Sequence, residues 1–299
     1  MTGPFPLVHR RAVEQDALFV AQQVAALPGP VLAQVAPLIA QAERETAEAL
    51  RHWIATAPDA NDRYTAYERR RLLVQLRAAF DTIKRVSPAL ASALGEGSKR
   101  AGVLSHQHLL SQITRNSARY GTSLEAPIRL DLARILATGE GLIPRFRASA
   151  ARYSVNVREQ IKRELAVGAL RGQTYQGLVE RLATRSMPHA LPTVDNAAGA
   201  LMKPAKWQLE RLVRTEMAHA SEVQAMEAFR QARVQIPDLR RRWIAALDLR
   251  ICRQRADMDG AVSDRRGSFS GDVQPPLHPN CRCVAVPWRE AWGEIDLAA

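Results

Sequence analysis

All three cysteines of the chain lie after Pro237, and a histidine precedes one of them by three positions. Cys252, His278, Cys281 and Cys283 offer three thiolates and one imidazole, which are the ligand types of a closed structural zinc site. Only one residue separates Cys281 from Cys283, which is not the usual spacing of zinc ligands. Two other interpretations stay open: small buried thiols beside a hydrogen-bonded His278, and a disulfide from Cys252 to Cys281 or Cys283.

A carboxylate, Glu216, falls within the apolar stripe of a helix predicted over residues 206–232. The stripe consists of Leu209, Leu212, Val213, Ala220 and Val223. A buried carboxylate is costly unless it is paired or hydrogen-bonded, so the pattern predicts a partner for Glu216. Arg250 and Arg282 are the candidates, because each stands beside a distinctive residue. The alternative is that Glu216 reaches solvent from the edge of the stripe, and a catalytic role is less favoured than either structural role.

The chain is strongly basic, with a net charge of +12. Arg240, Arg241 and Arg242 form a run, and Arg253 and Arg255 follow nearby. This cluster could contact phosphates, and we expect any contact with nucleic acid to be non-specific, because phosphate contacts carry no sequence information. No helix-turn-helix or zinc-finger spacing supports base recognition. The alternative is a solvated, arginine-rich surface.

Helices are expected to position most of these residues. Aromatic residues make up only 5% of the chain, and alanine and leucine supply most of the apolar content, which favours helices over a β-sandwich. In the first half, apolar periodicity predicts helices over residues 12–27, 31–57, 64–86, 103–120 and 127–137, with Pro28-Gly29-Pro30 ending the first of them.

The second half has a different pattern. It predicts helices over residues 161–167, 174–182 and 206–232, a proline-containing loop over 186–204, and short strands over 242–247 and 283–286. The predicted fold class is therefore mainly α. A long helical N-terminal region, residues 1–150, is followed by a small α+β C-terminal domain, residues 151–299.

Several of the singled-out residues follow one another in a distinctive order. Arg214-Thr215-Glu216 precedes Trp243, Asp248-x-Arg250-x-Cys252, Asp259-Gly260, and finally a proline-rich segment that contains His278, Asn280, Cys281, Arg282 and Cys283. This set resembles the phage Mu F-like (MuF) minor head protein domain over about residues 153–288. The chain departs from the family at Arg255, where many members have a second cysteine that gives Cys-x-x-Cys. The departure removes one candidate ligand and weakens a family-style metal or redox role.

The resemblance implies a structural minor head (capsid) protein of a tailed phage or phage-like particle. Such a protein associates with the portal and other head proteins, and acts in head morphogenesis and in DNA packaging, delivery or ejection. It is a virion component, in the capsid interior or at the portal vertex, and is synthesised in the host cytoplasm. Residues 1–150 would then dock on the portal or capsid, and non-specific contact with packaged DNA fits the basic charge.

The rival interpretations are an enzyme and a plain DNA-binding protein. Domains of this family occur fused to toxin or transferase modules, so ADP-ribosyl transfer or zinc-dependent hydrolysis is the enzymatic alternative. The sequence has no Gly-rich phosphate loop, nucleophile elbow or His-Glu-x-x-His motif, so we expect no enzymatic activity. We also expect no secretory signal and no stretch long and apolar enough to cross a membrane.

Overall fold

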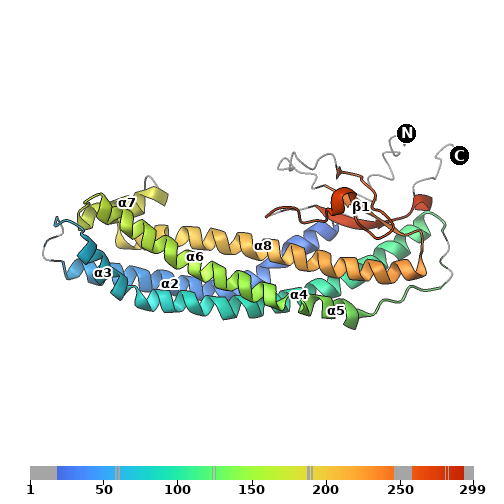
Figure 1. The fold of residues 1–299 in the computed structure, drawn as a ribbon, viewed down its shortest axis with the longest axis horizontal. Coiled ribbons are helices and arrows are strands. Elements are labelled where there is room, and N and C mark those ends of the chain that lie inside the picture. The colour runs from blue at the N-terminus through green and yellow to red at the C-terminus, as the bar shows by residue number, and fades with distance from the viewer. Residues whose placement is uncertain are drawn as a thin grey trace. The chain divides into compact units, whose positions relative to one another are not determined.

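The computed structural model describes residues 19–57, 59, 61–122, 124, 126–186, 189, 191–245, 258–279, 281 and 283–292. Helices dominate these residues, and a two-stranded antiparallel sheet lies near the C-terminus (Figure 1). The predicted fold class is thus confirmed. The helices are α2 (Pro28–Ala55), α3 (Ala66–Gln75), α4 (Arg77–Arg119), α5 (Leu132–Glu140), α6 (Ile143–Leu170), α7 (Tyr175–Ser186) and α8 (Val194–Gln235), and the strands are β1 (Arg240–Ile244) and β2 (Val284–Trp288).

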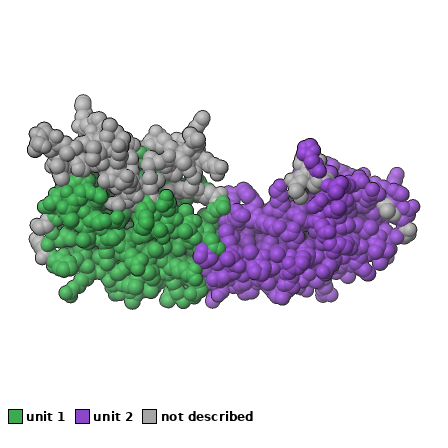
Figure 2. All heavy atoms as spheres, turned by 180° about the vertical axis from the view of Figure 1, so that it is seen from behind, with its two compact units in different colours: residues 1–29, 94–143, 213–299 green, residues 30–93, 144–212 purple. Residues whose placement is uncertain are grey.

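The chain divides into two compact units (Figure 2). Unit 1 comprises residues 1–29, 94–143 and 213–299, and unit 2 comprises residues 30–93 and 144–212. Helices α4 and α8 contribute residues to both units. Helix α6 runs through residue 150, where the sequence predicted a domain boundary, so each unit combines segments from before and after that position.

Two helices are longer than predicted. The helix predicted at 64–86 is divided between α3 and the start of α4, and α4 continues through the helix predicted at 103–120. Helix α8 begins at Val194, inside the predicted loop at 186–204. The loop prediction is therefore wrong from residue 194 onward. A proline inside a helix costs about 3 kcal/mol. Pro204 is tolerated because buried apolar side chains flank it on both sides: Ala197, Ala198, Leu201, Met202 and Ala205.

Helix α2 has a deeply buried face. Val31, Val35, Ile39 and Ala42 recur at helical spacing and are almost wholly buried. The helical stretch Phe19–Ala55 is nevertheless long and apolar enough, by length and composition, to cross a membrane, which corrects the expectation that no stretch could do so. The four side chains of this face are buried, whereas only 28% of the most apolar part of the stretch is buried in the structure.

In unit 1, α4, α5 and α8 meet around a buried glutamine. The Gln224 amide donates to the Ser98 carbonyl at 2.8 Å and to the Ala220 carbonyl at 3.1 Å. Its Oε1 would lie 2.1 Å from a Cβ on Gly102 and 2.8 Å from one on Gly139. Because any larger side chain would collide with the amide, these two glycines permit the close approach of the three helices.

The end of α8 binds an extended segment through two glutamine side chains. The side-chain oxygen of Gln235 accepts from the backbone amide of Arg129 at 2.9 Å, and the side-chain nitrogen of Gln235 donates to the backbone carbonyl of Arg129 at 2.7 Å. Gln231 accepts from the Asp131 amide at 2.6 Å. Ile128, just before these contacts, and Leu130, between them, pack on the apolar core of unit 1. The glutamines thus pair with this backbone as a neighbouring strand would.

Candidate functional site

Strand β1 is hydrogen-bonded along both of its edges. On one side it pairs with β2, in a register that sets Arg242 opposite Val286. On the other side it meets the segment 260–263, where the Trp243 amide donates to the Ala261 carbonyl at 2.8 Å and the Ser263 amide to the Arg241 carbonyl at 2.8 Å. The predicted strands at 242–247 and 283–286 are thereby confirmed over their described overlap with β1 and β2.

Arg241 lies beneath this sheet, 2% exposed. Its Nη2 is 2.5 Å from Glu222 Oε1 on α8, and its Nη1 donates to Gln274 Oε1 at 2.9 Å. The guanidinium also faces the rings of Phe229 and Phe269, at 6.0 and 5.8 Å from their centroids. Three separate segments therefore meet on one arginine: helix α8, strand β1 and the segment 267–274.

The pKa of the Glu222 carboxyl is raised by its burial, although the guanidinium of Arg241 opposes that rise. A buried ion pair with this geometry is costly to break from one side, because the remaining charge stays in a low-dielectric environment. The pair fixes the sheet on α8.

The loop after residue 263 closes on the same helix. Asp264 Oδ1 accepts from the amides of Arg266 and Ser268, both at 2.8 Å. Gly267 has φ +87°, and a Cβ there would lie 2.7 Å from Phe229 Cε1. Only glycine satisfies both the positive φ and this close approach to α8.

The motif residues around Trp243 have structural partners. Trp243 is fully buried and packs edge-on against Phe269, with ring centroids 5.1 Å apart. Asp259 Oδ1 accepts from the Ala245 amide at 3.1 Å, and Gly260 turns the chain with φ +79°. The Asp-Gly pair thus ends β1 and starts the segment that runs beside it.

The Arg-Thr-Glu motif lies on α8, and its glutamate is buried as the stripe predicted. Glu216 is 5% exposed, Thr215 is half-buried and Arg214 is exposed. The predicted partners of Glu216, Arg250 and Arg282, lie outside the described residues, as do Asp248, Cys252, Arg253, Arg255 and Asn280. The proposed pairing of Glu216 therefore stays a prediction.

Cys281 is buried and Cys283 half-buried, and neither forms a disulfide within the part of the chain that the structure describes. A hydrogen bond with Cys283 lowers the pKa of the Cys281 thiol to about 5, while desolvation by burial opposes this shift. His278 Nδ1 lies 2.9 Å from the Pro279 carbonyl oxygen. Within the described part of the chain, no group of three or more His, Cys, Asp or Glu side chains is arranged to hold a metal ion. A site or a disulfide that includes Cys252 involves a residue outside that part.

The arginine run does not form a uniform basic surface. Arg240 and Arg242 are half-buried, and Arg241 is buried and ion-paired. Arg241 is therefore not part of an exposed phosphate-contacting face, which corrects its place in the predicted basic patch. The alternation of a strand explains this: Arg241 and Trp243 are two positions apart and so lie on the same face.

Sequence reasoning missed the partners of Arg241. Glu222, Ser263, Gly267, Phe269 and Gln274 surround it or its backbone, and none of them was singled out. One signal was present in the sequence, because strand alternation places Arg241 on the same face as Trp243, and an inward-facing arginine needs an acid. The choice of Glu222 depends on tertiary packing.

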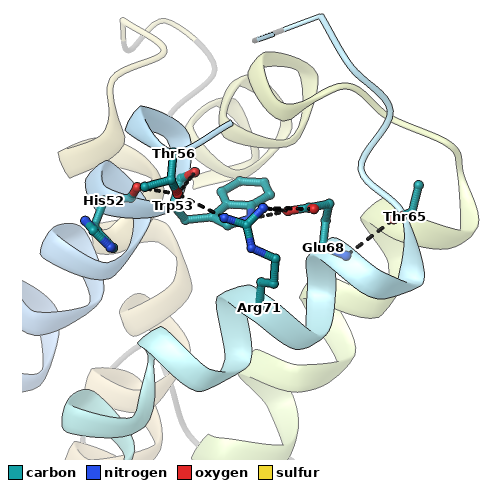
Figure 3. Close-up of polar contacts among 6 residues, drawn as sticks. All are labelled: His52, Trp53, Thr56, Thr65, Glu68 and Arg71. Atoms are coloured by element: carbon teal, nitrogen blue, oxygen red, sulfur yellow. Dashed lines mark hydrogen bonds and ion pairs between the residues drawn. The ribbon is translucent and has the colours of Figure 1, made fainter. Parts of the chain in front are cut away.

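A second buried polar cluster, also missed, lies in unit 2 (Figure 3). Trp53 Nε1 of α2 donates to Glu68 Oε2 at 3.3 Å, and Arg71 Nη1 contacts both carboxylate oxygens at 3.0 and 3.1 Å. Thr65 caps α3 by accepting from the Glu68 amide. Trp53 also stacks on Tyr175 at 4.3 Å, so the cluster joins α2, α3 and the start of α7.

Burial raises the pKa of Glu68, but hydrogen bonds from Tyr175, Arg71 and Trp53 outweigh it and hold this pKa below its ordinary value. The carboxylate is therefore charged and saturated with donors. This arrangement stabilises the fold of unit 2 and leaves the carboxylate poorly suited to act as a general base.

Comparison with known proteins agrees with the order of motifs in the chain. The sequence model of the family described as "Phage Mu protein F like protein" matches residues 159–286. No curated protein and no solved structure matches the chain. The matched region contains α7, α8, β1 and the Arg241–Glu222 anchor. Over residues 159–286 the chain is thus similar to the phage Mu protein F like family, and this similarity suggests a phage head morphogenesis protein.

Proposed function

We propose that this protein is a structural minor head protein of a tailed phage or phage-like particle. It associates with the portal vertex and acts in head morphogenesis and in DNA packaging and delivery, inside the capsid or at the vertex. The observation that carries the proposal is the family match over residues 159–286.

The chemistry of the matched region supports a structural role. Its most deeply buried cation, Arg241, is held by contacts with Glu222 and with neighbouring segments. A substrate-binding group would have to be reachable, whereas these side chains are covered. We therefore propose a protein without enzymatic activity, in preference to the transferase and zinc-hydrolase alternatives.

The experiment is a knockout with complementation in the phage that encodes this chain. Without the protein, we expect heads that are malformed or that deliver DNA poorly. Complementation with a tagged chain should restore infectivity and place a few copies in DNA-filled particles, as detected by mass spectrometry. The control in this complementation is the double variant Arg241→Met with Glu222→Met. It lacks the ion pair between the sheet and α8 but leaves no unpaired charge there. Full infectivity without the protein, or its absence from purified particles, would refute the proposal.

Non-specific contact with packaged DNA forms part of the proposal, and the net charge of +12 supports it. Binding to duplexes of unrelated sequence should be equal, and should fall linearly on a log–log plot against salt concentration. Sequence preference, or binding that salt does not weaken, would contradict this part.

A further inference from the structure

Two adjacent arginines, Arg265 and Arg266, stand in the loop that follows Ser263, and both are exposed. The loop is held through their backbone groups: the Arg266 amide donates to Asp264 at 2.8 Å, and the Arg265 carbonyl accepts from the side chain of Arg233. The side chains of Arg265 and Arg266 form no hydrogen bond or ion pair within the described residues. Their charges are therefore available to a partner outside the chain.

The loop lies across α8, beside two more arginines. A Cβ on Gly267 would lie 2.7 Å from a ring carbon of Phe229, and Arg233 reaches the Arg265 carbonyl, so the loop packs on this side of the helix. Arg230 precedes Arg233 by three residues and thus shares this side. It is exposed, and its side chain also has no partner among the described residues. We name the four residues together the arginine surface: Arg230, Arg233, Arg265 and Arg266.

The acidic side chains next to these arginines do not neutralise them. Glu227, one turn before Arg230 on α8, is buried and paired with Arg134 of α5 at 2.6 Å. Asp264 binds backbone amides of its own loop at 2.8 Å. Its charge offsets at most one of the four positive charges, so the arginine surface keeps an excess of positive charge.

We propose that the arginine surface binds the phosphate backbone of duplex DNA. The inference rests on the proposed contact with packaged DNA and deepens it by assigning that contact to one surface of unit 1. An arginine guanidinium presents several N–H donors in one plane and binds two phosphate oxygens at once. Because the loop is already fixed by Asp264, Gly267 and Arg233, binding orders little additional backbone.

An acidic protein or an unpaired strand fits the arginine surface less well. Protein interfaces obtain most of their binding energy from a few large anchoring side chains, and single-strand binders stack bases on exposed aromatic rings. The aromatic rings that pack beneath this loop, Phe229 and Phe269, are buried. The arginine surface therefore offers charge without an exposed ring, and duplex phosphates require only cations.

The test is the affinity of the full chain for a labelled duplex of arbitrary sequence, measured by fluorescence anisotropy at several salt concentrations. The double variant Arg265→Gln with Arg266→Gln should bind about tenfold more weakly at about 0.1 M salt. The slope of log affinity against log salt concentration should fall by about 2, because two phosphate contacts are lost. Replacing both residues by lysine keeps the charges and should retain most of the affinity.

The matched control is Arg44→Gln with Arg70→Gln. These two arginines are exposed on α2 and α3 in unit 2, and their side chains have no partner among the described residues. The control removes the same charge but should leave the slope unchanged and the affinity nearly so. All variants should melt with the wild type, because none of the replaced side chains makes a contact that stabilises the fold.

The outcomes separate the two proposals. If the wild type binds DNA and the two glutamine double variants weaken it equally, the arginine surface is refuted while the DNA contact stands. If the wild type does not bind DNA, the DNA contact itself fails and this inference fails with it. If Arg265→Gln with Arg266→Gln keeps its affinity for DNA but loses affinity for polyglutamate, the surface belongs to an acidic protein, which overturns the proposal.

Discussion

Arg241 is the residue through which the C-terminal sheet is attached to α8. Replacing it by methionine would leave Glu222 buried without its cation. We therefore expect Arg241→Met to lower the free energy of unfolding by about 3–5 kcal/mol, measured by denaturant titration. Arg240→Met, on the other face of β1, should cost far less. The double variant with Glu222→Met should recover most of the loss, because it removes both charges. If Arg241→Met and Arg240→Met lower the free energy of unfolding equally, the ion pair does not hold the sheet.

Glu68 makes the stability of unit 2 depend on pH. Its pKa in the folded chain is lower than its ordinary value, so its contribution is present above the unfolded pKa and is lost as the pH falls through the folded pKa. The difference in melting temperature between wild type and Glu68→Gln should therefore be largest near neutral pH and should shrink below about pH 4. Glu159→Gln, at an exposed ion pair with Lys162, is the control and should shift the melting temperature little. A difference that stays constant from pH 7 to pH 3 would contradict this assignment.

Individual residues show how much of the candidate site could be predicted from the sequence. The burial of Glu216 followed from helical periodicity. The role of Arg241 did not, since a run of three arginines looks solvated until strand alternation assigns each one to a face. The Glu68 cluster could not be predicted from the sequence either. Its hydrogen-bond donors come from positions 53, 71 and 175, which only the tertiary fold brings together.

At the scale of elements, two glycines of α4 offer a matched comparison. A Cβ at Gly102 would lie 2.1 Å from Gln224 Oε1, whereas one at Gly95 would meet nothing within 4 Å. Gly102→Ala should therefore destabilise the protein by about 1–3 kcal/mol. Gly95→Ala should be neutral or stabilising by up to about 1 kcal/mol, since alanine favours the helix. Thermal or denaturant unfolding of the two variants measures this difference, and an equal response would refute the packing assigned to α4, α5 and α8.

The sequence predicted the presence of most helices but not their lengths. Apolar periodicity is strong where one face is buried, as in α2. It weakens in α4 and α8, because their buried stripes include polar side chains such as Ser98, Gln112 and Gln224. Pro88 and Pro204 in these helices also resemble breaks. Local signals suggested that those helices end, while tertiary burial keeps them continuous.

At the scale of the whole molecule, each compact unit is assembled from segments distant in sequence. Cutting the chain at residue 150 would interrupt α6 and divide both units. We therefore expect the fragments 1–150 and 151–299, produced separately, to lack cooperative unfolding and to aggregate, while mixing them during refolding restores some native structure. Circular dichroism melts and size-exclusion chromatography test this. A fragment that is monomeric and unfolds cooperatively would show that the predicted boundary separates independent domains.

The glutamine contacts at the end of α8 have a consequence for backbone exchange with solvent. The amides of Arg129 and Asp131 belong to neither a helix nor a strand, and both residues are exposed. Such amides normally take up deuterium quickly, yet here each is held by the carbonyl of a glutamine side chain. We expect both to be protected in deuterium-exchange mass spectrometry, and Gln235→Ala to abolish the protection of Arg129 while the amides of α8 keep theirs. Fast deuteration of both in the wild type would contradict this. One side chain would then control whether the segment stays attached while the helix beneath it remains folded.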